Sequence, residues 1–240
     1  MNTYPVLIIP VYNPTKRLVT LVQQLTDLLS NSLIILVNDG SPKTSTEIFE
    51  QLKQTFNVTL LNHSCNLGKG QALKTAFNYC LEKKISTQGM ITMDADGQHL
   101  IDDIVNLYDK FINDPQALWI GTRSFPKSTP WRSRFGNNVT AFIFKKLLQT
   151  SIKDTQSGLR AIPLDLIPKL VQLKTTGFEF ELEMLIATIE NHVEIKTIPI
   201  KTVYIDKNKH SNFNPILDSI KVYQVLFSYF IKKYTTIFYE

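Results

Sequence analysis

The sequence predicts an α/β fold with a mostly parallel β-sheet and helices on both of its faces. Short apolar runs rich in β-branched residues, such as VLIIPVY and LIILVND, alternate with segments whose apolar residues recur at helical spacing. This alternation is typical of parallel sheets, whose strands are joined by helical crossovers. A second observation agrees with it, because polar residues follow most of the predicted strands.

The N-terminal half justifies the prediction element by element. Residues 6–12 and 33–39 read as strands around a helix whose apolar face holds Leu18, Leu21, Val22, Leu25, Leu28 and Leu29. Further elements follow in the same alternation: a strand in VTLLNHS, a helix from GQALKTAF, a strand in GMITMDAD, a helix over about 102–111 and a strand in LWIGTRS. We therefore expect a βαβ start that continues as a covered sheet.

The second half has a less regular pattern. Residues 124–138, with two prolines and several basic residues, read as a long loop, and loops of that length are often functional lids. A helix (139–149), a turn-rich stretch (153–163), an amphipathic helix (178–191) and strand material (193–205) are expected after it. The predicted domain spans residues 1–213, and residues 214–240 form a C-terminal amphipathic helix that contacts either a membrane or protein.

Composition narrows the class of protein. At 240 residues the chain fits one domain, or one domain with an appendage. The net charge of +5 comes from short basic groups, which suits phosphates or an anionic membrane surface better than nucleic acid. Two cysteines, no signal segment and no apolar window of about 18 residues favour a cytoplasmic protein. The C-terminal helix, with its apolar residues and lysines, predicts peripheral association with the inner face of the membrane.

Polar side chains gather at the predicted strand ends. The carboxyl ends of parallel strands meet at one edge of a sheet, and ligands bind beyond that edge. The residues expected there are Tyr12, Asn13, Asn38, Asp39, His63, Gly68, Lys69, Asp94 and Asp96.

Two of these strand ends suggest a ligand-binding site. Asp94 and Asp96, at i and i+2 of an extended chain, face the same way, and with Gln98 they offer the oxygen ligands that Mg²⁺ or Mn²⁺ prefers. The alternative is an acidic helix N-cap. The NLGKG segment precedes a predicted helix, so backbone N–H groups and Lys69 could hold an anion. The alternative is that the glycines only form the turn between a loop and the helix.

Eight motifs in register resemble a known family. They are IIPVYN, LVNDGS, NLGKGQAL, DADGQH, GTR, RFGN, DTQSGLRA and GFEFELEML. In that order they are similar to the GT-A inverting glycosyltransferases of family two, and within it to the polyprenyl-phosphate sugar synthases of the dolichyl-phosphate mannose or glucose type. The resemblance covers roughly residues 5–215.

The resemblance implies roles for individual residues. Pro10, Tyr12 and Asp39 would line the nucleotide base and ribose, Asp94 and Asp96 would hold the donor, and Asp96 with Gln98 would bind the metal. The predicted donor site also takes in Asn13, Gly68, Lys69 and Ala95. The predicted catalytic residues are Asp96 and three arginines that face the acceptor phosphate or the donor diphosphate: Arg123, Arg132 and Arg134. Pro14 departs from the family pattern, which commonly has Glu after YN.

The predicted function is metal-dependent, inverting transfer of a hexose from a nucleotide-diphosphate sugar to a polyprenyl phosphate. A phosphate acceptor is already a nucleophile, whereas a hydroxyl acceptor on a polysaccharide or glycolipid would need a base such as Glu179, Glu181 or Glu183. A non-catalytic nucleotide-sugar-binding protein is a third interpretation. A membrane surface, a membrane-protein partner or a second copy of the chain are further expected partners.

Overall fold

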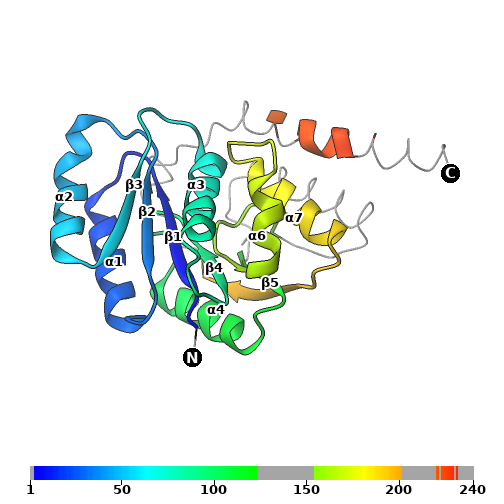
Figure 1. Ribbon diagram of the computed structural model, residues 1–240, viewed down its shortest axis with the longest axis horizontal. Helices are drawn as coiled ribbons and strands as arrows, with labels where there is room; N and C mark the ends of the chain where they lie inside the picture. Colours follow the sequence, from blue (N-terminus) through cyan, green and yellow to red (C-terminus); the bar gives the residue numbers. More distant parts are fainter. Residues whose placement is uncertain (1–2, 124–153, 202–219, 222, 230, 232–240) are drawn as a thin grey trace.

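A single seven-stranded sheet organises the chain (Figure 1), for which the computed structural model describes residues 3–123, 154–201, 220–221, 223–229 and 231. The strand order is β3-β2-β1-β4-β6-β5-β7. Only β6 among these strands runs antiparallel to its neighbours, β4 and β5. The strands are β1 (Val6–Val11), β2 (Ile34–Asn38), β3 (Val58–Asn62), β4 (Gly89–Thr92), β5 (Leu118–Arg123), β6 (Arg160–Pro163) and β7 (Ile195–Ile200).

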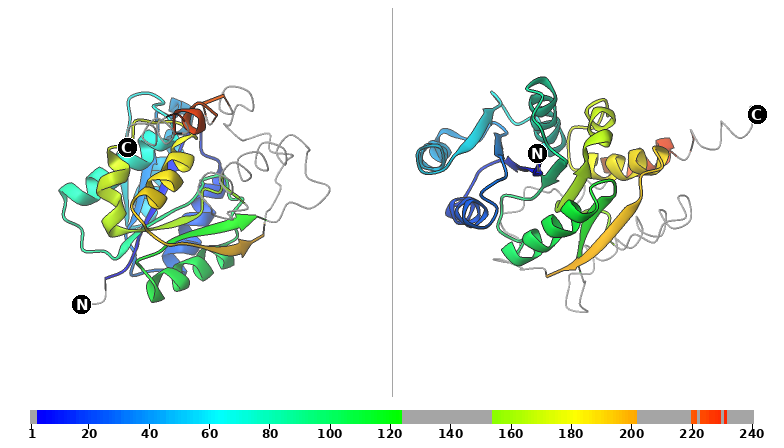
Figure 2. Two further views of the ribbon diagram at one scale, coloured as in Figure 1. Left: turned by 90° about the vertical axis from the view of Figure 1, so that its right-hand side faces the viewer. Right: turned by 60° about the horizontal axis from the view of Figure 1, so that its bottom comes forward.

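Helices cover both faces of the sheet (Figure 2). One core cluster joins the sheet to α3 (Lys69–Glu82), α6 (Ile167–Val171) and α7 (Phe180–Glu190). The other cluster joins it to α1 (Lys16–Leu28), α2 (Thr46–Thr55) and α4 (Ile101–Asn113). Two short 3-10 turns, η1 (Lys43–Ser45) and η2 (Leu164–Leu166), precede α2 and α6.

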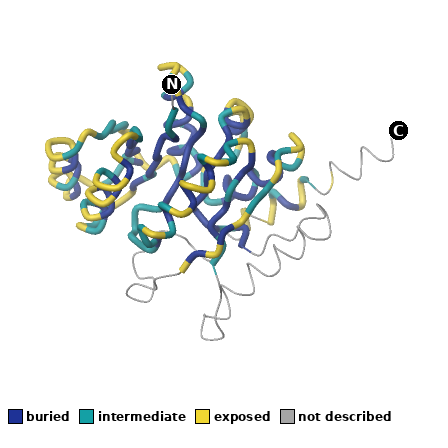
Figure 3. Tube along the Cα trace, turned by 90° about the horizontal axis from the view of Figure 1, so that it is seen from below, coloured by how far each residue is buried: buried dark blue, intermediate teal, exposed yellow. Residues whose placement is uncertain are grey.

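The central strand β1 shows why the apolar runs are continuous. Val6 and Ile8 point into the cluster under α3, while Leu7 and Ile9 point into the cluster under α1. All four are at most 2% exposed, as the buried centre in Figure 3 shows. A strand buried on both faces needs apolar residues at every position, unlike an antiparallel strand with one wet face.

The predicted α/β class and its mostly parallel sheet are confirmed, with two corrections. The stretch 153–163 contains β6, which the turn-rich sequence hid because this strand is four residues long and includes Arg160 and Pro163. Helix α2 was not predicted, since only Phe49 and Leu52 along it are buried. The predicted loop 124–138 and helix 139–149 lie outside the described residues.

The C-terminal helix is described at residues 220–221, 223–229 and 231, and it has two different faces. Leu226 is 5% exposed and belongs to the core cluster of α7, against which Val225 and Tyr229 also pack. On the other side Tyr223 and Phe227 are 37% and 65% exposed. Within the described ranges, no helix has the length and hydropathy needed to cross a membrane.

Candidate active site

The carboxyl edge of the sheet brings the predicted strand-end residues together. Val11, Asn38 and Asn62 lie in register on β1, β2 and β3, so these strands end side by side. The backbone N–H of Asp39 donates to Val11 O at 2.8 Å, and that of His63 donates to Asn38 O at 2.9 Å. The chain segments after the strands are thereby fixed to one another before any side chain contributes.

Asp94, just beyond β4, has protein partners on both carboxylate oxygens. Its Oδ1 accepts from Lys69 Nζ at 2.6 Å, and its Oδ2 lies 3.2 Å from His99 Nε2. A Cβ on Gly158 would lie 2.5 Å from Oδ2, so only glycine fits against this carboxylate. Burial alone would raise the pKa of Asp94, but the Lys69 charge and His99 outweigh it and hold that pKa well below its usual range.

Lys69, the first residue of α3, bridges two carboxylates. Its Nζ lies 2.6 Å from Asp94 Oδ1 and 2.6 Å from Glu181 Oε1, and 5.8 Å from the centre of the Phe178 ring. Burial lowers the pKa of an ammonium, yet the two carboxylates overcome this effect and raise the pKa of Lys69 above its ordinary value. The structure thus gives this lysine two protein partners, and its contact with an anion stays a prediction.

Asp96 differs from Asp94 in its surroundings. Its Oδ1 accepts the backbone N–H of Gln98 at 2.9 Å. Burial and the neighbouring charge of Asp94 raise the pKa of Asp96, because both disfavour a second negative charge there. A cation bound at Asp96 would relieve that repulsion, so the site fits one electrostatically.

The ligand set at Asp96 suits a hard cation that keeps other oxygen ligands. No three His, Cys, Asp or Glu side chains in the described part of the chain form a metal-binding group. Mg²⁺ and Mn²⁺ are commonly held by one or two carboxylates together with water and substrate phosphates. Asp96 and Gln98 are the residues that would hold such an ion here.

Asp39, after β2, organises the loop before α3. Its carboxylate accepts the backbone N–H groups of Leu67 and Gly68, each at 2.9 Å, and its Oδ1 lies 2.7 Å from His63 Nδ1. His63 Nε2 in turn lies 2.9 Å from Thr75 Oγ1. Asp39 is 3% exposed, so in this structure it fixes this loop, and its contact with a nucleotide stays a prediction.

The start of α3 is also engaged by protein. The backbone N–H of Gly70 donates to Gly177 O at 3.2 Å, and that of Gln71 donates to Thr176 O at 2.9 Å. Gly68 has φ +99°, and a Cβ there would lie 2.5 Å from Thr176 O. These contacts give the GKG segment a structural role, and the anion site at Gly68 and Lys69 stays a prediction.

Arg123, at the end of β5, forms a two-pronged ion pair with Asp154. Its Nε donates to Asp154 Oδ2 at 2.7 Å and its Nη2 donates to Oδ1 at 3.1 Å. Asp154 is 0% exposed. Arg123 therefore has a structural role, since it holds the DTQSG turn at the site. Its contact with phosphate stays a prediction.

Arg160, at the start of β6, is fully buried and fixes the same turn. It donates to Ser157 O at 2.8 Å, to Thr155 O at 2.9 Å and to Glu181 O at 2.5 Å. Arg160 therefore holds the DTQSG turn through backbone carbonyls. The turn is thereby linked to α7.

The glutamates at the start of α7 are committed to protein contacts. Glu179 Oε1 accepts the backbone N–H of Gly177 at 3.0 Å, and Glu183 Oε2 accepts the Thr175 hydroxyl at 2.5 Å. Glu181 pairs with Lys69. Side chains of this kind before and within a first helical turn also favour the helix dipole.

The remaining predicted residues lie at or near the ends of β1 and β4, or outside the described residues. Pro10 pairs with Val37 in the sheet, Tyr12 is 38% exposed, and the backbone N–H of Asn13 donates to Ser41 Oγ at 3.0 Å. Ala95 packs against the core cluster of α4. Two predicted arginines lie outside the described residues: Arg132 and Arg134.

Sequence reasoning missed three partners: Asp154 for Arg123, Glu181 for Lys69 and Thr75 for His63. Both acids belong to the motifs DTQSG and GFEFELE, which were the signal available in the sequence.

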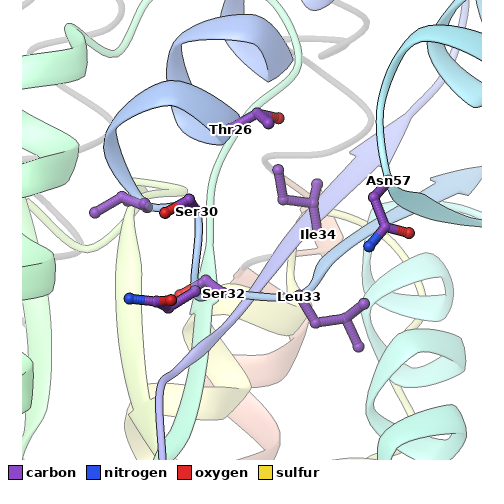
Figure 4. Close-up of a pocket in the computed structure, with 8 residues that line it drawn as sticks. Thr26, Ser30, Ser32, Leu33, Ile34 and Asn57 are labelled. Carbon is purple, nitrogen blue, oxygen red and sulfur yellow. The ribbon is translucent and has the colours of Figure 1, made fainter.

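A hollow of about 280 Å³ lies at the opposite edge of the sheet beside Ile34 (Figure 4). It has no charged lining residue and contains none of the predicted site residues.

Known proteins place the chain among glycosyltransferases. The chain is 32% identical to the UDP-N-acetylglucosamine–dolichyl-phosphate N-acetylglucosaminyltransferase of Methanococcus voltae, over 92% of this chain and 94% of that protein. It is 27% identical to the polyprenol monophosphomannose synthase of Mycolicibacterium smegmatis (80% and 75%). It is also 28% identical to the dolichyl-phosphate beta-glucosyltransferase of Saccharomyces cerevisiae (90% and 70%).

A solved structure shows the same fold. Glucosyl-3-phosphoglycerate synthase from Mycobacterium tuberculosis, crystallised with Mn²⁺, UDP and glucosyl-3-phosphoglycerate, matches with a TM-score of 0.68 at 16% identity, over 94% of this chain and 79% of that one. The expected GT-A fold is thus confirmed. The family model described as glycosyl transferase family 2 matches residues 6–169, more than half of the sequence. The chain belongs to glycosyl transferase family 2.

Proposed function

We propose that this glycosyltransferase moves a hexose from a nucleoside-diphosphate sugar to a polyprenyl phosphate, with inversion at the anomeric carbon. The names of three relatives support the acceptor class, since each includes a dolichyl or polyprenol phosphate. The observation that carries the proposal is that each of the three glutamates at the start of α7 has a protein partner on one carboxylate oxygen, while Glu179 Oε2 is buried without a partner among the described residues.

The acceptor side suits a nucleophile that needs no base. Glu179 is 7% exposed and Glu181 is 5% exposed, and Glu183 accepts from Thr175, so these carboxylates are poorly placed to take a proton from a hydroxyl. A phosphate oxygen is already anionic at neutral pH. It needs to be oriented, and the planar fork of an arginine is suited to that task.

The proposed reaction is a single displacement. An acceptor phosphate oxygen attacks the anomeric carbon, the bond from that carbon to the donor diphosphate breaks, and the electron pair leaves on the nucleoside diphosphate. A bound Mg²⁺ or Mn²⁺ would supply positive charge to the leaving diphosphate. Asp96 and Gln98 would hold that ion, while Lys69 and His99 keep Asp94 in place.

The C-terminal helix offers a membrane contact that matches a lipid acceptor. Ile220, Tyr223 and Phe227 are exposed and spaced three and four residues apart, so they share one face. Leu226 packs into the core, which holds the helix on the domain. We propose that this exposed face lies on an anionic bilayer on the cytoplasmic side, with nearby lysines at the headgroups.

Transfer should depend on a divalent cation and on Asp96. The purified chain is incubated with radiolabelled UDP- and GDP-sugars, Mg²⁺ or Mn²⁺ and a short polyprenyl phosphate, and label in the organic phase is counted. Asp96→Asn, which removes a charge from the cation site, should lower transfer by about a hundredfold. Asp165→Asn, an exposed acid near the opposite sheet edge, is the control. Full activity in excess chelator would contradict the metal requirement.

Substitutions on the acceptor side should separate a phosphate from a hydroxyl nucleophile. Arg134→Ala, and to a lesser degree Arg132→Ala, should lower transfer by about ten- to a hundredfold, because each removes a charge-assisted contact to an anion. Glu183→Gln keeps an oxygen acceptor for Thr175 and should change the rate by no more than about twofold.

A hydroxyl acceptor reverses this order, since loss of a general base costs on the order of 10²–10⁴ in rate. An inactive Glu183→Gln variant beside active arginine variants would therefore overturn the phosphate proposal. Arg123→Ala is a poor probe for this question, because it would also leave the buried Asp154 without its cation.

Vesicle binding should depend on the exposed face of the C-terminal helix. Phe227→Glu should weaken flotation with anionic liposomes by about ten- to a hundredfold, the effect of losing one buried aromatic side chain. Leu28→Glu is the matched control, since Leu28 is 58% exposed on α1, remote from this helix. Equal flotation of the two variants would exclude this face as the membrane contact.

A further inference from the structure

Lys69 is an ammonium held between two carboxylates from distant parts of the chain. Its side chain is 13% exposed, and Nζ lies 2.6 Å from both Asp94 Oδ1 and Glu181 Oε1. The Phe178 ring lies 5.8 Å away on another side. A lysine paired with two carboxylates, one buried (Glu181, side chain 6% exposed) and one partly exposed (Asp94, 32%), acts as a fixed internal cation.

The backbone around Lys69 leaves it little freedom. The N–H groups of the next two residues, Gly70 and Gln71, donate to the carbonyls of Gly177 and Thr176. A Cβ on Gly70 would lie 2.5 Å from the Phe180 Cβ, so α3 and the start of α7 are in close contact. The packing of α3 against the start of α7 therefore positions the ammonium beside Asp94.

The two aspartates of the DADGQH motif are thus unequal. Both carboxylate oxygens of Asp94 face cationic or imidazole groups, Lys69 and His99. Among the described residues, Asp96 Oδ1 accepts the backbone N–H of Gln98 at 2.9 Å and has no cationic partner comparable to Lys69. A divalent cation would have to displace an ammonium to reach Asp94 Oδ1, but not to reach Asp96 Oδ1.

We propose that Lys69 is a positioning residue that serves as the fixed counter-ion of Asp94 and thereby directs the divalent cation to Asp96. This proposal rests on the cation-dependent reaction proposed above. It assigns the lysine no contact with donor or acceptor. Glu181 takes part by accepting a second hydrogen bond from the ammonium, at 2.6 Å.

The proposal predicts a gain of metal affinity when the lysine is lost. Mn²⁺ alone is titrated into the full chain, without nucleotide or acceptor, and free Mn²⁺ is measured by electron paramagnetic resonance. Lys69→Met should tighten binding by about tenfold, a change of about 1.4 kcal/mol, because Asp94 becomes available as a ligand. Lys69→Arg, which keeps the charge, should bind Mn²⁺ like the parent.

A matched control and a double-mutant cycle separate direct competition from general charge. Lys83→Met removes the same charge at the exposed far end of α3 and should leave binding unchanged. In an Asp94→Asn background, Lys69→Met should give at most about a twofold gain, since no carboxylate is freed. An equal gain in both backgrounds would overturn the proposal, as would unchanged or weaker binding in Lys69→Met.

A folding defect need not end the test. Lys69→Met leaves Asp94 and Glu181 without a cation, which costs stability. If circular dichroism shows that this variant is unfolded, the same cycle is run in a Glu181→Gln background, where only Asp94 is left unpaired. Because the readout is Mn²⁺ binding, a failure of lipid-phosphate transfer would overturn the proposed acceptor and leave the role of Lys69 standing.

Discussion

Charge burial is the constraint on which the carboxyl edge of this sheet depends. The charged groups that meet there include the carboxylates of Asp94, Asp96, Asp154 and Glu181 and the cations of Lys69, Arg123 and Arg160. An uncompensated charge in such a site costs several kcal/mol, so each group must lie beside a partner. Asp96 lies beside the like charge of Asp94, and a bound divalent cation would relieve that repulsion.

These pairs also join parts of the site that are far apart in sequence. Lys69, at the start of α3, meets Glu181 of α7, which lies 112 residues later. Arg160 binds both the 154–158 turn and the carbonyl of Glu181. The side that we assign to the donor, built on the N-terminal strands, is therefore fixed against the side that we assign to the acceptor. A site held in this way presents its charges without reorganisation, which is the usual source of electrostatic catalysis.

Most of the sheet could be predicted because strand and helix periodicity are local properties of the sequence. The common location of the strand-end residues Asp39, Asp94 and Asp96 could also be predicted, since parallel strands end at one edge of the sheet. Strand β6 could not be predicted, because Arg160 is buried only through carbonyls that the fold brings to it. The GKG segment fits either an anion site or a structural turn, because its contact with Glu181 cannot be inferred from the local sequence.

The position of a bound Mn²⁺ ion tests the central claim most directly. Crystals of the full chain are soaked in Mn²⁺, and the ion is located by its anomalous scattering. We predict a peak in coordination contact with the Asp96 carboxylate, with Lys69 Nζ still bonded to Asp94. A peak that bridges Asp94 and Asp96, with Lys69 turned away from Asp94, would contradict the account.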